Sequence, residues 1–119
     1  MHLFVTGGTG FFGKALLRHW SSAGRSKLAG ARITLLSRNP VKFRKENTEL
    51  VSGLDVRMVE GDIQHPETLP EGDYTHVLHA ATDSTTGLDL TPLQRFDQIV
   101  LGTRNVLELA RRTGKPRVL

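Results

Sequence analysis

The stretch VTGGTGFFGKALL, residues 5–17, places a turn rich in glycine between a short apolar segment and an apolar helical pattern. The segment before the turn, residues 2–5, is typical of a strand that is buried on both faces. The residues after the turn predict a helix with four side chains on one face, namely Phe12, Leu16, Leu17 and Trp20. The sequence therefore predicts a strand, a tight turn and a helix at the amino end of the chain.

Three glycines recur at three-residue intervals in this turn, Gly7, Gly10 and Gly13, and Gly8 begins a G-x-G-x-x-G pattern. Glycine tolerates positive φ and close backbone approach, and it leaves bare amides at the start of the following helix. Such amides favour a pyrophosphate. We expect Gly7 to make the turn, Gly10 to admit the phosphates and Gly13 to let the helix lie close to the strand. The pattern predicts dinucleotide binding, and a P-loop is excluded because no Gly-Lys-Ser/Thr is present.

The composition is that of one small domain without thiol chemistry. The chain has 119 residues, 38% of them hydrophobic, which is enough for a modest core. It contains no cysteine, so disulfides and thiolate metal sites are excluded, and a reducing compartment fits. The apolar run after Met1 is too short for a signal peptide, and no run is long enough to cross a bilayer. We expect a soluble, cytoplasmic protein with no membrane partner.

The net charge of +4 raises the question of nucleic-acid binding. The basic residues are spread along the chain without interleaved aromatic residues, which is typical of a solvated surface. We therefore predict no nucleic-acid partner. Charge-driven nucleic-acid binding stays a third hypothesis, which salt-sensitive binding to arbitrary DNA would support.

Strand and helix patterns alternate along the rest of the chain. Strands are predicted over residues 33–36, 55–63 and 74–82, and residues 117–119 resemble the opening of a fifth strand. A short surface helix is predicted over residues 41–52, and a long helix begins at Thr91 and Pro92 and ends at Gly114. The alternation predicts an α/β protein with a doubly wound parallel sheet, a Rossmann fold that stops at the start of its fifth strand. A ligand crevice is expected at the carboxyl ends of the strands.

The long helix has apolar residues on two sides. Its predicted core face consists of Phe96, Ile99, Val100, Thr103, Leu107 and Ala110. Leu101 and Leu109 are expected on the opposite side, so this helix, residues 92–113, is a candidate homodimer interface. Coverage by a further part of the protein explains the second side equally well.

The end of the second predicted strand bears on cofactor choice. NAD-binding proteins of this fold place an acid there to hold the ribose 2′-hydroxyl, whereas this chain has Ser37 and Arg38. A carboxylate would repel a 2′-phosphate, and a guanidinium can pair with one and stack on adenine. We therefore predict a preference for NADP over NAD. The alternative is that Arg38 only faces solvent.

The ends of the third and fourth predicted strands also carry candidate ligand contacts. Asp62 can accept a hydrogen bond from the adenine amino group, and Ile63 can add a backbone amide and an apolar wall. The alternative for Asp62 is an ordinary turn residue. Ala80 and Ala81 are small where a cofactor would lie close to the backbone, although packing within a strand explains them equally well.

Four stretches resemble the extended short-chain dehydrogenase/reductases, specifically the NAD-dependent epimerase/dehydratase family that acts on nucleotide sugars. They are TGGTGFFG at residues 6–13, GDI at 61–63, HAA at 79–81 and VLGTRNVLELAR at 100–111. The resemblance implies that the first stretch, with Phe11 and Phe12, holds the pyrophosphate. It implies that Asp62 and Ile63 hold the adenine, and that Ala80, Ala81 and Thr82 lie on the nicotinamide side.

The sequence departs from the family's pattern at three places. Ser37 stands where the family has an acid, and Ile99 stands where it has an asparagine. The family's catalytic Tyr-x-x-x-Lys pair follows the fifth strand, but Tyr74, the single tyrosine, precedes the fourth. We therefore assign no catalytic residue and expect residues 1–119 to be an incomplete NAD(P)-binding domain, inactive alone. The catalytic and nucleotide-sugar-binding part is expected outside them.

Three alternatives concern the remaining chemistry. A sensor or scaffold of the same fold that binds NADP without turnover is the second functional hypothesis. His76 and His79 are three residues apart in a strand and point to opposite faces, so we predict packing roles and no metal site. The polar loop at residues 83–86 either touches substrate or is solvated.

Overall fold

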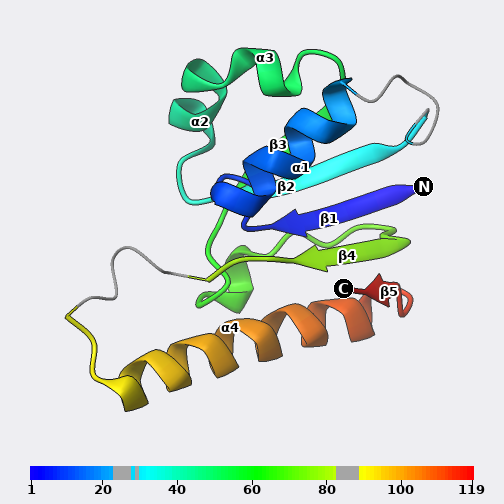
Figure 1. Cartoon of the computed structure of the whole chain (residues 1–119). Helices are drawn as coiled ribbons and strands as arrows, with labels where there is room; N and C mark the ends of the chain where they lie inside the picture. Colours follow the sequence, from blue (N-terminus) through cyan, green and yellow to red (C-terminus); the bar gives the residue numbers. More distant parts are fainter. Residues whose placement is uncertain (23–27, 29, 83–88) are drawn as a thin grey trace.

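Five parallel strands form one sheet in the order β3-β2-β1-β4-β5 within the described part of the chain, residues 1–22, 28, 30–82 and 89–119 of this computed structural model (Figure 1). The strands are β1 (His2–Thr6), β2 (Arg32–Ser37), β3 (Asp55–Glu60), β4 (His76–His79) and β5 (Arg117–Val118). The order reverses beside β1, because β2 and β4 pair on either side of it. The predicted doubly wound parallel sheet is confirmed.

Helices cover both faces of this sheet. The helices are α1 (Phe11–Ser22), α2 (Pro40–Glu46), α3 (Thr48–Val51) and α4 (Pro92–Arg112), with a 3₁₀ turn η1 (Pro66–Thr68). Figure 1 shows α1, α2 and α3 on one face and α4 on the other. The predicted surface helix at 41–52 is two short helices that meet at Asn47. No helix among the described residues has the length and apolar character needed to span a membrane.

Two apolar clusters fill the layers on either side of the sheet. Leu17 of α1 and Phe43 of α2 pack with Val5 and Leu35 on one side. Val106 and Leu109 of α4 pack with Phe4, Val77 and Tyr74 on the other side. The predicted core face of α1 is wrong at Phe12, whose side chain is 73% exposed, because the first turn of α1 lies at the edge of the sheet.

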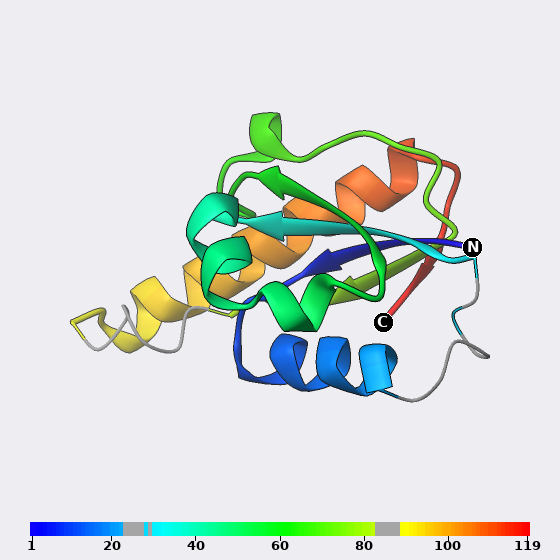
Figure 2. The same ribbon diagram turned by 90° about the horizontal axis from the view of Figure 1, so that it is seen from above.

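The predicted core face of α4 is wrong at four of its six residues, whereas Ala110 is buried as predicted. The buried residues of this helix are Gly102, Asn105, Val106, Leu109 and Ala110. Phe96, Ile99, Val100 and Leu107 are exposed, and Leu109, expected on the outer side, is fully buried. The first turns of α4 extend past the carboxyl ends of the strands, so they have no sheet to cover (Figure 2). The small residue Ala110 packs in the cluster beside the sheet, and Gly102 lets the helix lie close to the loop after β3.

Strands β3 and β4 end earlier than predicted. β3 ends at Glu60 and β4 at His79, so residues 61–63 and 80–82 leave the ladder. They form loops at the carboxyl edge of the sheet, where ligands bind in open α/β folds. The start of α4 is as predicted, because the Thr91 hydroxyl accepts from the Gln94 amide at 3.3 Å and Pro92 follows.

Candidate functional site

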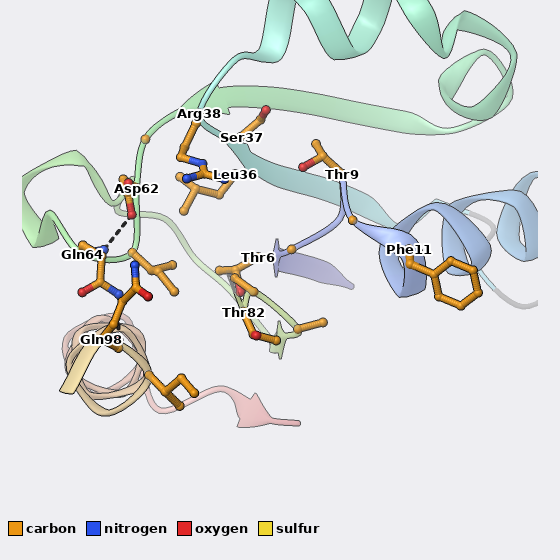
Figure 3. A pocket seen from close by; sticks show the side chains of 17 residues that line it. Thr6, Thr9, Phe11, Leu36, Ser37, Arg38, Asp62, Gln64, Thr82 and Gln98 are labelled. Carbon is orange, nitrogen blue, oxygen red and sulfur yellow. Dashed lines mark hydrogen bonds between the residues drawn. The ribbon is translucent and has the colours of Figure 1, made fainter. Parts of the chain in front are cut away.

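A cavity of about 450 Å³ lies at the carboxyl edge of the sheet, between the start of α1 and the side of α4. Most of the predicted site residues line it: Gly7, Gly10, Phe11, Ser37, Arg38, Asp62, Ile63, Ala80, Ala81 and Thr82. Phe12 and Gly13 are not among its lining residues. In Figure 3, Asp62, Gln64 and Gln98 gather on one side of the cavity and Phe11 lies on the other. The structure therefore brings four separate strand ends to one site.

The glycine turn is shaped by close backbone contacts. Gly7 has a φ of +72°, and a Cβ there would overlap the backbone of Ala80. A Cβ at Gly13 would overlap the Gly7 carbonyl and the Gly8 backbone, so Gly13 packs the helix onto the turn itself. The Gly10 amide donates to the Gly7 carbonyl at 3.0 Å. The first amides of α1 lack intrahelical acceptors, and this end of the helix is the positive end of its dipole.

Ser37 and Arg38 have different environments at the end of β2. Ser37 is buried, and its hydroxyl oxygen accepts from the Asn39 amide at 3.1 Å. Its carbonyl accepts from the Gly61 amide at 3.0 Å, which ties the ends of β2 and β3 together. Arg38 is exposed and borders the cavity (Figure 3). Ser37 therefore shapes the turn, and Arg38 presents a positive charge to the cavity.

Asp62 lies in a tightly bonded loop after β3. Its Oδ1 accepts from the Gln64 amide at 2.9 Å, the dashed line in Figure 3. Its own amide donates to the Thr68 hydroxyl oxygen at 2.9 Å. These bonds fix the carboxylate, and Ile63 forms the neighbouring apolar wall.

Several residues that line the cavity were not predicted from the sequence: Leu36, Gly61, Gln64, Gln98 and Ile99. Thr6 and Thr9 also line it and lie in the stretch 6–13 that was expected to hold the pyrophosphate. Gln64 Nε2 donates to the Gln98 carbonyl of α4 at 2.7 Å. Asn105, which is buried on α4, donates from Nδ2 to the Ile63 carbonyl at 2.8 Å. An asparagine within the long helical pattern was the available signal for such a contact, since asparagine is unfavourable in a helix interior.

His79 joins three elements beside the cavity. Its Nδ1 is 2.7 Å from the Thr6 hydroxyl oxygen, and its Nε2 is 3.2 Å from that of Thr103 on α4. Burial lowers the pKa of His79, because desolvation disfavours the imidazolium. His76 instead lies 2.9 Å from the Thr75 hydroxyl oxygen. In the described part of the chain no group of three or more His, Cys, Asp or Glu can hold a metal ion. The polar loop at 83–86 lies outside the described residues.

The strand order and the strand, glycine turn and helix at its centre define a Rossmann-type α/β protein. A model of the NAD dependent epimerase/dehydratase family matches residues 3–119. The chain therefore belongs to this family, which confirms the resemblance carried by its four sequence stretches. A search of curated protein sequences gave no match.

Solved structures share the fold. A UDP-galactose 4-epimerase gives a TM-score of 0.69 at 22% identity, over 99% of this chain and 36% of that chain. The dTDP-glucose 4,6-dehydratase of Streptomyces venezuelae, solved with NAD and TYD bound, gives 0.75 at 24% identity, over 99% and 38%. The ADP-L-glycero-D-manno-heptose-6-epimerase of Helicobacter pylori gives 0.68 at 23% identity, over 98% and 37%. The chain thus spans little more than a third of these structures.

Proposed function

We propose that the cavity binds a nicotinamide dinucleotide and that these residues form the cofactor-binding part of a nucleotide-sugar epimerase, dehydratase or reductase. The observation that carries the proposal is the meeting of the glycine turn with the ends of β2, β3 and β4 in one cavity. Gly10 and the start of α1 take the pyrophosphate, because bare amides and the helix dipole favour anions there. Asp62 and Ile63 take the adenine, and Ala80, Ala81 and Thr82 border the nicotinamide.

The proposed cofactor is NADP in preference to NAD. Arg38 borders the cavity at the end of β2, the place where proteins of this fold contact the adenosine ribose. Ser37 beside it carries no charge that would repel a phosphate. A guanidinium binds a phosphate through charge-assisted, bidentate hydrogen bonds. Support for the preference therefore comes from the position and the charge of Arg38.

Calorimetric titration of the protein with NADP and with NAD tests both parts of the proposal. We expect Arg38→Ala to weaken NADP binding by roughly tenfold or more, since a charged hydrogen bond contributes about 1.5 to 3 kcal/mol. NAD binding should change much less. Arg18→Ala, on the exposed side of α1 and outside the cavity lining, is the matched control. No binding of either cofactor by the wild type would refute the site, and equal loss of both cofactors would refute the preference.

Turnover is proposed for the intact protein and not for residues 1–119 alone. Tyr74 is buried and its hydroxyl donates to the Pro70 carbonyl at 2.8 Å, so it does not serve the cavity. A bound nicotinamide would accept and return a hydride during turnover. Conversion of a nucleotide sugar to product by the full-length protein supports the enzyme, with reduced nicotinamide appearing only transiently where the hydride is returned. Cofactor binding without turnover on any of them supports the alternative, a sensor or scaffold of the same fold.

A homodimer through α4 is proposed from the exposed side of this helix. Leu93, Phe96, Val100 and Leu107 are all exposed, and their spacings of three, four and seven residues follow a heptad pattern like the seam of paired helices. The sequence placed Leu101 and Leu109 on the dimer side, but Leu109 is fully buried, and Leu101 is exposed off this seam, so Leu101 serves as a control. We expect Leu107→Glu to convert a dimer of the full-length protein to a monomer in sedimentation, and Leu101→Glu to leave it unchanged. A monomeric wild type would refute the interface.

A further inference from the structure

The loop after β3, residues 61–65, contacts one face of α4 at three successive positions. Gln64 Nε2 donates to the carbonyl of Gln98 at 2.7 Å, and Asn105 Nδ2 donates to the carbonyl of Ile63 at 2.8 Å. Between them, a Cβ at Gly102 would lie 2.6 Å from Ile63 Cδ1. Positions 98, 102 and 105 share a helix face, because they are separated by four and three residues. The loop is thus fastened to α4 along two turns of helix.

Asn105 is a buried polar residue in α4 whose side chain bonds to the loop after β3. It is buried, and it shares its side of the helix with Val106 and Leu109. Asparagine is less favourable in a helix interior than alanine or leucine, and a buried amide needs hydrogen-bond partners. The contact with the Ile63 carbonyl satisfies the amide donor. An apolar residue at position 105 would pack with Val106 and Leu109, but it could not hydrogen-bond to the loop.

Gln64 connects the anchor to the cavity. Its backbone amide donates to Asp62 Oδ1 at 2.9 Å while its side chain reaches α4. Asp62, Ile63 and Gln64 all line the cavity, whereas Gly102 and Asn105 are not among the lining residues. A displacement of the loop from α4 would therefore move the carboxylate and the apolar wall together.

We propose that Asn105 and Gly102 are positioning residues for the adenine end of the dinucleotide, with Gln64 as the link between α4 and Asp62. The proposal rests on the dinucleotide site proposed above. The anchor holds the wall in its binding geometry before the ligand arrives, which removes an ordering cost from association. Neither Asn105 nor Gly102 touches the ligand.

The first test is Asn105→Leu, which keeps a similar volume and removes the donor. In the intact protein we expect ADP-ribose and NADP to bind about tenfold more weakly, with the ratio of NADP to NAD affinity unchanged. Amide exchange in the cofactor-free protein should become faster at residues 62–65 and stay the same in β1 and β2. Asn47→Leu is the matched control, because Asn47 Nδ2 also donates to a backbone carbonyl, that of Phe43, away from the cavity.

A second pair of variants applies if Asn105→Leu does not fold. Gly102→Ala should weaken NADP binding, and Ile63→Val in the same chain should restore part of the loss, since it removes Cδ1, the nearest of the atoms that the new methyl meets, while Gln64 Nε2 stays 2.9 Å away. Ile63→Val alone is the reference for the double variant, because Ile63 itself lines the cavity, and Gly53→Ala, which meets nothing within 4 Å among the described residues, is the control. Folded Gly102→Ala or Asn105→Leu protein that binds ADP-ribose like the wild type would overturn the positioning role and leave the dinucleotide site standing. A wild type that binds no dinucleotide would overturn both.

Discussion

The glycine turn and the loop after β3 form two walls of the same cavity, and different forces hold them in shape. The turn is fixed by close backbone contacts at Gly7 and Gly13, where side chains have no room. The loop is fixed by side-chain hydrogen bonds from Thr68, Gln64 and Asn105. We expect the turn to be disrupted when an atom is added, because its residues leave no space for a side chain. We expect the loop to be disrupted when a hydrogen-bonding group is removed.

The largest effect is expected from an added atom in the turn. Gly7→Ala combines positive φ with overlap of the Ala80 backbone, and we expect it to lower the free energy of unfolding by about 3 kcal/mol. Gly30 has a φ of +75°, and none of the described residues lies within 4 Å of its added Cβ, so Gly30→Ala measures the cost of the backbone conformation alone, about 1 kcal/mol. Urea denaturation measures both. Equal losses would mean that close approach at Gly7 does not matter.

A smaller effect is expected from a removed donor in the loop. Thr68→Val deprives the Asp62 amide of its acceptor and the His65 carbonyl of a donor at 2.7 Å. We expect a loss of about 1 to 2 kcal/mol in the free energy of unfolding. Thr48→Val is the control, because its hydroxyl donates to the Arg44 carbonyl on the exposed surface, and it should change stability by less than about 0.5 kcal/mol. A neutral Thr68→Val would show that the loop is held without this hydroxyl.

The smallest effect concerns pH at the end of β4, between the two walls. Burial lowers the pKa of His79 below its usual 6.5, so the folded state prefers the neutral ring. Its stabilising contribution is complete above 6.5 and is lost as the pH falls through 6.5 toward the folded pKa. We expect His79→Gln to flatten the decline in stability with acid between pH 7 and 5, as monitored by thermal unfolding. His19→Gln, on the exposed side of α1, should leave that decline intact.

The turn was predictable from the sequence because its constraints are local. Gly7, Gly10 and Gly13 lie within seven residues of one another, and their steric requirements follow from the strand and the helix on either side. The positions of Arg38, Asp62 and Ala80 at the carboxyl edge followed from the parallel strand order in the same way.

The anchoring of the loop was not predictable because it joins distant parts of the chain. Gln64 and Gln98 are 34 residues apart, and Ile63 and Asn105 are 42 apart. The buried face of α4 was missed for a related reason. Its sequence holds two apolar stripes, and only the position of the helix on the sheet decides which one is covered. The spacing of apolar residues predicts that a helix has an apolar face, but it does not predict which of two apolar faces lies against the sheet.

The bond from the Gln64 amide to Asp62 Oδ1 has a consequence for base selectivity. That bond uses one acceptor site of Oδ1 and orients the carboxylate, and the acceptor sites left for an incoming purine accept and do not donate. Adenine offers its exocyclic amine to such an oxygen in the proposed complex, whereas hypoxanthine offers a carbonyl that the carboxylate repels. We therefore expect a dinucleotide that carries hypoxanthine in place of adenine to bind more weakly than its adenine counterpart, with or without a 2′-phosphate on the ribose.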